Sequence, residues 1–145
     1  MGGQYPRGKE ANFYRPDPAS TGYALDHFPG KATFVGWEVG EAVLTGGPYL
    51  RNRLPGNSPV YQAYAAYNNF AGRSSWDQLA VLLLDKEARR RFFTTVTGYR
   101  VTVDDEGAND LVPDPSSRHR YLRLAVAPTE IALYIDSLVI DHVPK

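Results

Sequence analysis

Apolar residues near the C-terminus recur at the spacing of one helix face, i, i+3, i+4, i+7 and i+8. These residues are Ile131, Tyr134, Ile135, Leu138 and Val139, and they follow Pro128. The run from Leu79 to Leu84 is instead apolar on nearly all sides. We therefore expect the helix from Asp77 to about Lys86 to be buried.

Two further helices are predicted from their first residues. Asp17-Pro18 and Ser58-Pro59 each combine a side chain that caps free backbone amides with a proline suited to the first helical position. The first helix is expected to end at Pro29-Gly30. A short helix is also expected between Trp37 and Leu44. The helix behind Ser58 would carry on one face Val60, Ala63, Tyr64, Tyr67 and Phe70.

Strands are predicted in three places. Ala32–Val35 is a short apolar run that suits a buried strand of a parallel sheet, Phe92–Val103 is expected to be extended, and Tyr121–Val126 alternates apolar and polar residues. A turn is expected at Asp104–Gly107. Helices and short apolar strands together predict an α/β layer fold. Because few strands are available to flank Ala32–Val35, the pattern is that of a piece of a larger sheet.

Composition restricts the classes of function. The 145 residues suit a single domain, and the formal net charge is zero, which argues against nucleic acid or an anionic membrane as main partner. The absence of Cys excludes disulfides and thiolate metal sites. The longest apolar run is far too short to span a bilayer. The first residues, which are Gly- and Pro-rich, do not have the pattern of a signal peptide.

Isolated polar residues elsewhere carry no catalytic pattern. His27, His119 and His142 are scattered, and lone histidines are usually surface residues or hydrogen-bonded core residues. Arg89–Arg91 is most simply a solvated helix end. The acidic residues 104–106 lack the ligand spacing of a calcium loop. No Ser/His/Asp arrangement or phosphate-binding loop is present.

The first cluster that could carry chemistry lies in the loop expected over residues 1–14. Glu10 and Asn12 are two positions apart, so in an extended loop they would point the same way. A carboxylate accepts hydrogen bonds and an amide both donates and accepts, which suits sugar hydroxyls. The alternative is a solvated polar loop, which is the commoner case.

The second cluster is Trp76-Asp77, at the start of the helix expected within residues 73–86. Asp77 could be a cap or a first-turn charge favoured by the helix dipole. It could also be an oxygen ligand for Ca²⁺, which prefers carboxylates and carbonyls. Trp76 could be a core residue, or it could stack on a planar base.

Taken in order, several segments resemble one family. They are MGGQYPRGKEANFY, DPAS, FVGWEVGEAVLTG, GRSSWDQLAVL and HRYL, and they span nearly the whole chain. Each is moderately specific, whereas the ordered set resembles the C-terminal half of the inosine/uridine-type nucleoside hydrolases. The resemblance implies a Rossmann-like open sheet with flanking helices, of which this chain would be the C-terminal part.

The resemblance also implies an activity and a set of site residues. Members of the family hydrolyse the N-glycosidic bond of ribonucleosides in nucleoside salvage, using a Ca²⁺ ion that binds the ribose hydroxyls and a water. Glu10 and Asn12 match the residues that bind the ribose, and Asp77 matches a ligand of the calcium. Trp76 falls where some members have a Trp that stacks on the leaving base, which would favour purine nucleosides.

Two departures from the family pattern limit the expected activity. The stretch Gln4–Arg7 lacks an Asn that many members carry upstream of the Glu. The N-terminal Asp-rich motif, which supplies the general base, is absent. Ca²⁺ normally takes about 6–8 oxygen ligands, so the one matched carboxylate leaves its site incomplete. The isolated chain is therefore expected to be inactive.

The origin of the other half is left open. A split gene with an N-terminal half on another chain, a truncated gene and an excised domain all fit, and a homo-oligomer is compatible with each. Met1 is natural in the family motif, so it need not be the initiator. The compartment would be cytoplasmic, or periplasmic if a signal peptide precedes Met1 in the gene. The alternative function is that of a non-catalytic α/β remnant that binds a sugar or a partner chain.

Overall fold

The longer helices begin where a capping position meets a proline. In the computed structural model, which describes residues 1–15 and 17–143, α2 (Pro18–His27) starts behind Asp17, whose carboxylate accepts a hydrogen bond from the Ser20 amide at 3.0 Å. α5 (Pro59–Asn68) starts behind Ser58, and α8 (Pro128–His142) has Pro128 in its first turn. The helices predicted at these three positions are confirmed.

The main sheet has three strands in the order β1-β7-β4. β1 (Ala32–Phe34) pairs in parallel with β7 (His119–Leu124), and β4 (Phe93–Val96) pairs with β7 in the antiparallel direction. Within residues 1–15 and 17–143, the other edge of β1 has no strand partner. The chain is therefore of the α/β class, with β1 at an edge of the sheet.

A separate hairpin consists of β5 (Tyr99–Val103) and β6 (Asn109–Pro113). The turn predicted between them is present, since the Gly107 amide donates to the Asp104 carbonyl at 3.0 Å. The extended segment predicted from Phe92 is in fact two strands, and Phe92 itself ends the helix α7 (Lys86–Phe92). β6 was not predicted, because its sequence NDLVP is polar and ends in proline.

Short elements connect these parts. They are α1 (Ala11–Tyr14), α3 (Trp37–Ala42), β2 (Leu44–Thr45), α4 (Pro48–Arg51), β3 (Arg73–Ser74) and α6 (Trp76–Leu82). β2 and β3 form a two-stranded antiparallel pair. The short helix predicted between Trp37 and Leu44 is thus present as α3.

The two faces of the main sheet contribute to different cores. Successive side chains of β7 point to opposite faces, so Leu122 packs in one cluster and Tyr121 in the other. The larger cluster joins the sheet to α3, α6, α7 and α8 through residues that include Val39, Leu79, Phe92 and Ile131. The smaller one is built on Tyr5, Phe13, Val101 and Tyr121, and it holds the N-terminal segment against the sheet and the hairpin.

The prediction that the Leu79–Leu84 segment is buried on nearly all sides is wrong. Leu79 and Leu82 are buried, but Val81 is 65% and Leu84 is 83% exposed. The helix also ends at Leu82, because Asp85 caps a new helix by accepting from the amides of Glu87 and Ala88. α6 therefore buries one side only. The face predicted for the helix behind Ser58 is shorter than expected, because α5 ends at Asn68 and Phe70 follows it with a φ of +60°. Phe70 is buried, whereas Tyr67 is 61% exposed.

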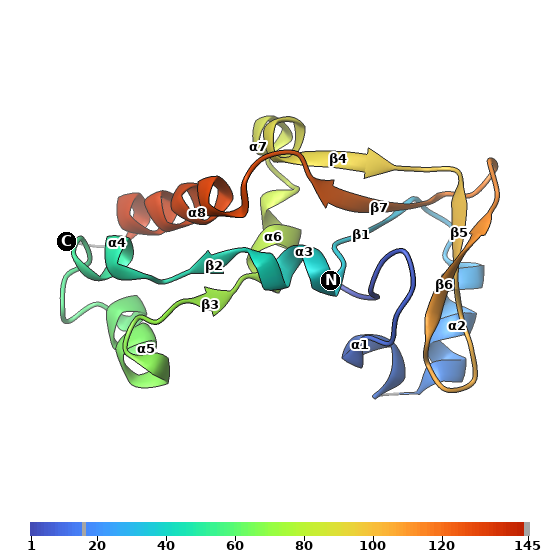
Figure 1. Ribbon diagram of the computed structural model, residues 1–145, viewed down its shortest axis with the longest axis horizontal. Helices are drawn as coiled ribbons and strands as arrows, with labels where there is room; N and C mark the ends of the chain where they lie inside the picture. Colours follow the sequence, from blue (N-terminus) through green and yellow to red (C-terminus); the bar gives the residue numbers. More distant parts are fainter. Residues whose placement is uncertain (16, 144–145) are drawn as a thin grey trace.

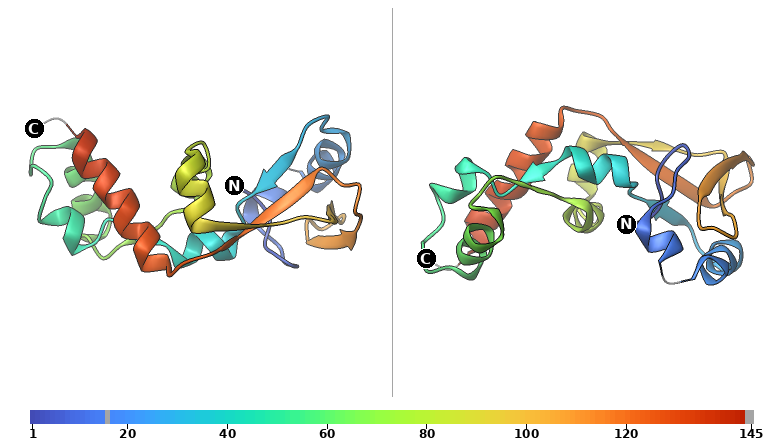
Figure 2. Two further views of the ribbon diagram at one scale, coloured as in Figure 1. Left: turned by 90° about the horizontal axis from the view of Figure 1, so that it is seen from above. Right: turned by 60° about the horizontal axis from the view of Figure 1, so that its bottom comes forward.

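The molecule is elongated (Figure 1). α2 and the β5–β6 hairpin lie at one end, and α4 and α5 lie at the other with the C-terminal part of α8, an arrangement that both views of Figure 2 also show. Across the described ranges 1–15 and 17–143, no helix is long and apolar enough to cross a membrane.

Candidate functional site

The N-terminal loop, residues 1–10, lies along the end of β1 and the start of α3. The Gly2 amide donates to the Val35 carbonyl at 3.1 Å, and the Trp37 amide donates to the Gly3 carbonyl at 2.9 Å. Gly3 has a φ of +75°, a conformation that favours glycine. The backbone of the loop is therefore held in one place by the strand and helix beside it.

Glu10 is the most buried acidic residue of this region. Its side chain is 4% exposed, and its Oε2 accepts hydrogen bonds from the Gly3 amide at 3.2 Å and the Asn12 amide at 3.1 Å. Between residues 1–15 and 17–143 no hydrogen bond reaches its Oε1. One carboxylate oxygen thus holds the loop and caps α1, and the other can accept from a ligand.

Asn12 does not share the environment of Glu10. It lies in α1 and is exposed, and its Nδ2 is 3.5 Å from the Met1 Sδ. The prediction of an extended loop in which Glu10 and Asn12 point the same way is wrong in its local structure, because Glu10 caps a helical turn. The ribose-binding roles of both residues remain predictions.

Glu10 borders a pocket of about 370 Å³ on the surface of the loop. The residues that line this Glu10 pocket are Gln4, Lys9, Glu10, Ala11, Tyr14, Arg15 and Trp37. It combines an amide, a carboxylate, two cations and two aromatic rings. Such a mixture suits a small polar ligand with a flat or apolar face.

Trp76 contacts the backbone of a residue that lines the Glu10 pocket. Its indole Nε1 donates to the Trp37 carbonyl at 2.9 Å. A Cβ added to Gly40 would lie 2.1 Å from the Trp76 Cδ1, so the indole packs closely on α3. The Arg73 guanidinium lies 5.2 Å from the Trp76 ring. Trp76 therefore fastens the start of α6 to α3, and its role toward a leaving base remains a prediction.

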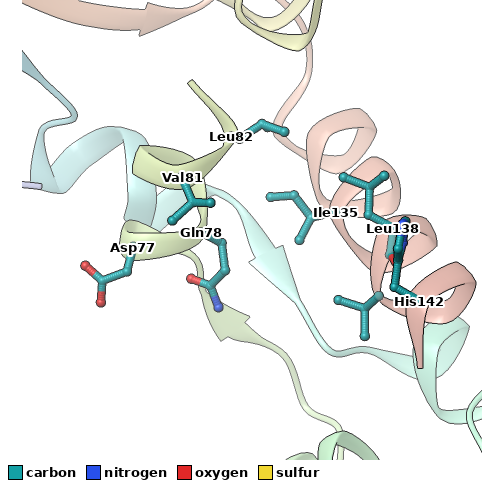
Figure 3. Close-up of a pocket in the computed structure, with 8 residues that line it drawn as sticks. Asp77, Gln78, Val81, Leu82, Ile135, Leu138 and His142 are labelled. Carbon is teal, nitrogen blue, oxygen red and sulfur yellow. The ribbon is translucent and has the colours of Figure 1, made fainter. Parts of the chain in front are cut away.

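Asp77 occupies the first turn of α6 and is exposed. It lies at the rim of a groove of about 630 Å³ between α6 and α8, and its carboxylate points away from α8 (Figure 3). This α6–α8 groove is otherwise lined mainly by apolar side chains, among them Val81, Leu82, Ile135 and Leu138. No contact joins Asp77 directly to Glu10 in the described part of the chain.

The donors on this chain do not fit Ca²⁺ by themselves. Within residues 1–15 and 17–143, no group of three or more His, Cys, Asp and Glu side chains is placed to hold a metal ion. Asp77 supplies one carboxylate, whereas Ca²⁺ takes about 6–8 oxygen ligands. The role of Asp77 as a calcium ligand remains a prediction.

Glu38 is a site residue that the sequence analysis missed. Its Oε2 accepts from the Tyr5 amide at 3.0 Å, so it holds the N-terminal loop at a second point besides Glu10. Burial raises the pKa of Glu38, although backbone hydrogen bonds and the nearby Arg123 act in the opposite direction. Glu38 lies in the first turn of α3, shortly after the apolar run Ala32–Val35, and a charge so close to that run was the available signal.

The Tyr5 hydroxyl is buried beside both carboxylates. Burial first, and then the charges of Glu38 and Glu10, raise the pKa of this phenol, which therefore stays protonated. Of the described residues, none accepts or donates a hydrogen bond at its oxygen. Its ring stacks on Tyr121 with centroids 4.9 Å apart. Tyr5 thus serves the packing of the loop.

Asn109 also holds the N-terminal loop and was not predicted. Its Oδ1 accepts from the Gln4 amide at 2.9 Å, and its Nδ2 donates to the Gln4 carbonyl at 2.8 Å. Its backbone pairs with Gly8. Because its partners lie about a hundred positions away, no local pattern could have indicated this role.

The histidines have no catalytic arrangement. His119 is buried, and its Nδ1 accepts from the Val101 amide at 3.1 Å. Its Nε2 therefore carries the proton and donates to the Leu25 carbonyl at 3.1 Å. His27 and His142 are exposed and bond to carbonyls of their own helices. The prediction that these are surface or hydrogen-bonded core residues is confirmed.

Comparison of the chain with protein-family models, with curated proteins and with solved structures gives no match. Any statement of function therefore rests on the residues and geometry described above.

Proposed function

We propose that this chain is the C-terminal half of a calcium-dependent nucleoside hydrolase and forms one side of its ribonucleoside site. The observation that carries the proposal is the Glu10 carboxylate, which is almost fully buried, bound at Oε2 by two amides and free at Oε1 beside a pocket. A fixed carboxylate oxygen is a suitable acceptor for sugar hydroxyls. In this proposal Glu10 and Asn12 bind the ribose.

A hydrogen bond between the Trp76-Asp77 cluster and the Glu10 pocket supports the same interpretation. The hydrogen bond from Trp76 to Trp37 connects the start of α6 to the residue that lines the Glu10 pocket. Trp76 would contact the leaving base and Asp77 would be one ligand of the calcium. The sheet would be the C-terminal part of a Rossmann-like open sheet, continued beyond the free edge of β1 by strands of the other half.

In this proposal the two halves of the enzyme supply different groups to the site. This chain offers no candidate for the general base, and a single carboxylate does not hold Ca²⁺. When bound, the calcium would orient the ribose and a water. This chain's residues would bind and orient the nucleoside, and the other half would supply the base and most metal ligands. Alone, the chain is expected to bind weakly and to hydrolyse nothing.

The test is reconstitution. If the reading frame upstream of this one encodes an Asp-rich motif after a strand, the two products should be expressed together and assayed for Ca²⁺-dependent release of base from inosine and uridine. Activity should be lost in Asp77→Ala. Trp76→Ala should reduce turnover of inosine more than that of uridine. An inactive complex, or release of base by this chain alone, would overturn the proposal.

A second candidate function is a non-catalytic remnant that binds a partner chain. Two observations favour it, the unpaired edge of β1 and the apolar α6–α8 groove. Val81, which lines this groove, is 65% exposed. Edges and apolar patches of this kind are common at interfaces. An unrelated upstream gene would favour the remnant over the split hydrolase.

A further inference from the structure

Two cations lie at the Glu10 pocket without acidic partners. The ion pairs among residues 1–15 and 17–143 join Arg7 to Asp110, Arg91 to Glu130 and Arg100 to Asp26. Neither Lys9 nor Arg15, which both line the pocket, takes part in one. The one acid that lines the pocket is Glu10, whose Oε2 is already bound by two amides. The pocket therefore carries excess positive charge.

The two cations lie at the two ends of α1, and both line the pocket. Arg15 directly follows α1, one turn beyond Ala11, so both residues lie on the same side of that turn. The Lys9 ammonium lies 5.4 Å from the centroid of the Tyr14 ring, which precedes Arg15 in the chain. Since Lys9 and Arg15 line one pocket of about 370 Å³, a small anion bound in it would lie near both cations.

The other lining residues suit an uncharged polar group instead. Glu10 offers its Oε1 as an acceptor, and the side-chain amide of Gln4 can donate and accept. Trp37 offers a large apolar surface beside them. The pocket therefore has one part suited to hydroxyls and another suited to an anion, and its volume of about 370 Å³ admits a small ligand that carries both.

We propose that the Glu10 pocket binds a phosphorylated pentose, with the sugar hydroxyls at Glu10 and Gln4 and the phosphate between Lys9 and Arg15. Arg and Lys are the usual phosphate ligands in proteins. The inference rests on the proposed function and deepens it, because the ribonucleoside site would then bind a nucleoside 5′-monophosphate or its pentose phosphate more tightly than the uncharged nucleoside.

The test is a binding comparison on the full 145-residue chain. Ribose 5-phosphate, ribose and inorganic phosphate are titrated by calorimetry, and the fluorescence of Trp37 is followed separately in Trp76→Phe. Ribose 5-phosphate should bind at least about tenfold more tightly than ribose, a difference of about 1.4 kcal/mol. Added salt should reduce this preference.

Matched variants assign the effect to the pocket. The double variant Lys9→Ala/Arg15→Ala should bind ribose 5-phosphate no more tightly than ribose, while Lys31→Ala/Arg53→Ala, with two exposed cations elsewhere, should keep the preference. Glu10→Gln should weaken ribose and ribose 5-phosphate alike. Because Lys9 and Arg15 are exposed, their replacement should leave the circular dichroism spectrum unchanged.

Several results would overturn the inference. These are equal affinities for ribose and ribose 5-phosphate, inorganic phosphate binding as tightly as ribose 5-phosphate, or no binding of any of the three. Inosine 5′-monophosphate and inosine, compared in the same way, tell whether a nucleotide or a free pentose phosphate is preferred. These outcomes can be told apart from those of the reconstitution assay. If the reconstituted complex is inactive but this chain still prefers ribose 5-phosphate through Lys9 and Arg15, only the hydrolase proposal is overturned.

Discussion

Gly40 lies where α3 meets α6, and there is no room there for a side chain. An added Cβ would lie 2.1 Å from the Trp76 Cδ1 and 2.7 Å from the Trp76 Cα. The Gly40 carbonyl also accepts the Ser75 amide at 3.0 Å, so the two backbones are held close together. The position of the Trp76-Asp77 pair therefore depends on a glycine about forty residues earlier in the chain.

Gly40→Ala is expected to destabilise the protein. Overpacking costs roughly 1–3 kcal/mol, and the clash with the Trp76 backbone puts this site near the upper end of that range. Alanine gains about 1 kcal/mol over glycine in a helix, so a net loss of about 2 kcal/mol is expected. Urea unfolding measures it. Gly56→Ala is the control, because an added Cβ there meets nothing within 4 Å. Equal midpoints for the two variants would show that α6 can move away from α3 without loss.

Asp136 is a buried carboxyl on α8. It is 4% exposed, and its Oδ1 accepts from the Gly46 amide at 3.0 Å. Burial raises the pKa of Asp136, against the smaller opposite effect of the Gly46 hydrogen bond. The folded protein therefore binds this proton more readily than the unfolded chain does.

The sign of the pH dependence follows from this raised pKa. The contribution of Asp136 to the free energy of unfolding is fully present below the pKa of the unfolded chain, which is about 4. It is lost as the pH rises through the higher pKa of the folded protein. Relative to Asp136→Asn, the wild-type free energy of unfolding should therefore fall as the pH rises above about 4. Urea unfolding across this range measures the difference. Asp141→Asn, an exposed site on the same helix, is the control. A wild-type value that rises relative to Asp136→Asn would contradict the prediction.

At the scale of elements, the N-terminal loop is held by contacts with several distant parts of the chain. Val35 (directly after β1), α3 and β6 each supply a hydrogen-bonding partner, and Asn109 of β6 supplies two through its side chain. Asn109 is 1% exposed, so loss of its side chain leaves the Gln4 amide and carbonyl without their partners.

Asn109→Ala should destabilise the protein by about 1–3 kcal/mol, because buried polar groups lose their hydrogen bonds. Hydrogen exchange at Gln4 and Gly8 should rise more than elsewhere. Asn109→Asp keeps the acceptor but loses the donor, so it should not restore stability. Asn57→Ala, at an exposed position, should change neither measurement. Unchanged exchange at Gln4 in Asn109→Ala would mean that the loop is held mainly by Val35 and α3.

The elements that could be predicted are those with local signals. The starts of α2, α5 and α8 depend on a cap or proline within a few residues, and β1 and β7 depend on short apolar patterns. β6 could not be predicted, because its strand structure comes from pairing with β5 and not from its own residues. The burial of α6 was overestimated, because an apolar run does not say which neighbours are present to cover it.

The candidate site was predictable to a similar degree. Glu10, Trp76 and Asp77 came from motif order, and Trp76 does lie beside the backbone of a residue at the Glu10 pocket. Asn109 could not be found, since its bond to Gln4 spans 105 positions. Lys9 and Arg15 were passed over because isolated surface cations carry no signal until the fold places them at one pocket.

At the scale of the whole molecule, the elongated shape leaves surfaces that a larger protein would cover. The free edge of β1, the α6–α8 groove and the exposed Asp77 are all features of this kind. If the other half supplies the remaining calcium ligands, then metal binding and assembly are coupled, because residues 1–15 and 17–143 hold no group of three or more acidic or histidine side chains placed for a metal ion.

Calcium should therefore leave the thermal stability of the isolated chain unchanged. A ligand stabilises a fold only in proportion to its binding, and one exposed carboxylate binds Ca²⁺ too weakly to contribute. Thermal unfolding with and without Ca²⁺ measures this, with Mg²⁺ as control. In the reconstituted complex Ca²⁺ should raise the Tm, chelation should reverse the rise, and Asp77→Ala should abolish it. A Ca²⁺-specific rise in the isolated chain that Asp77→Ala removes would instead mean that this chain forms a calcium site alone, and the division of ligands between two halves would be wrong.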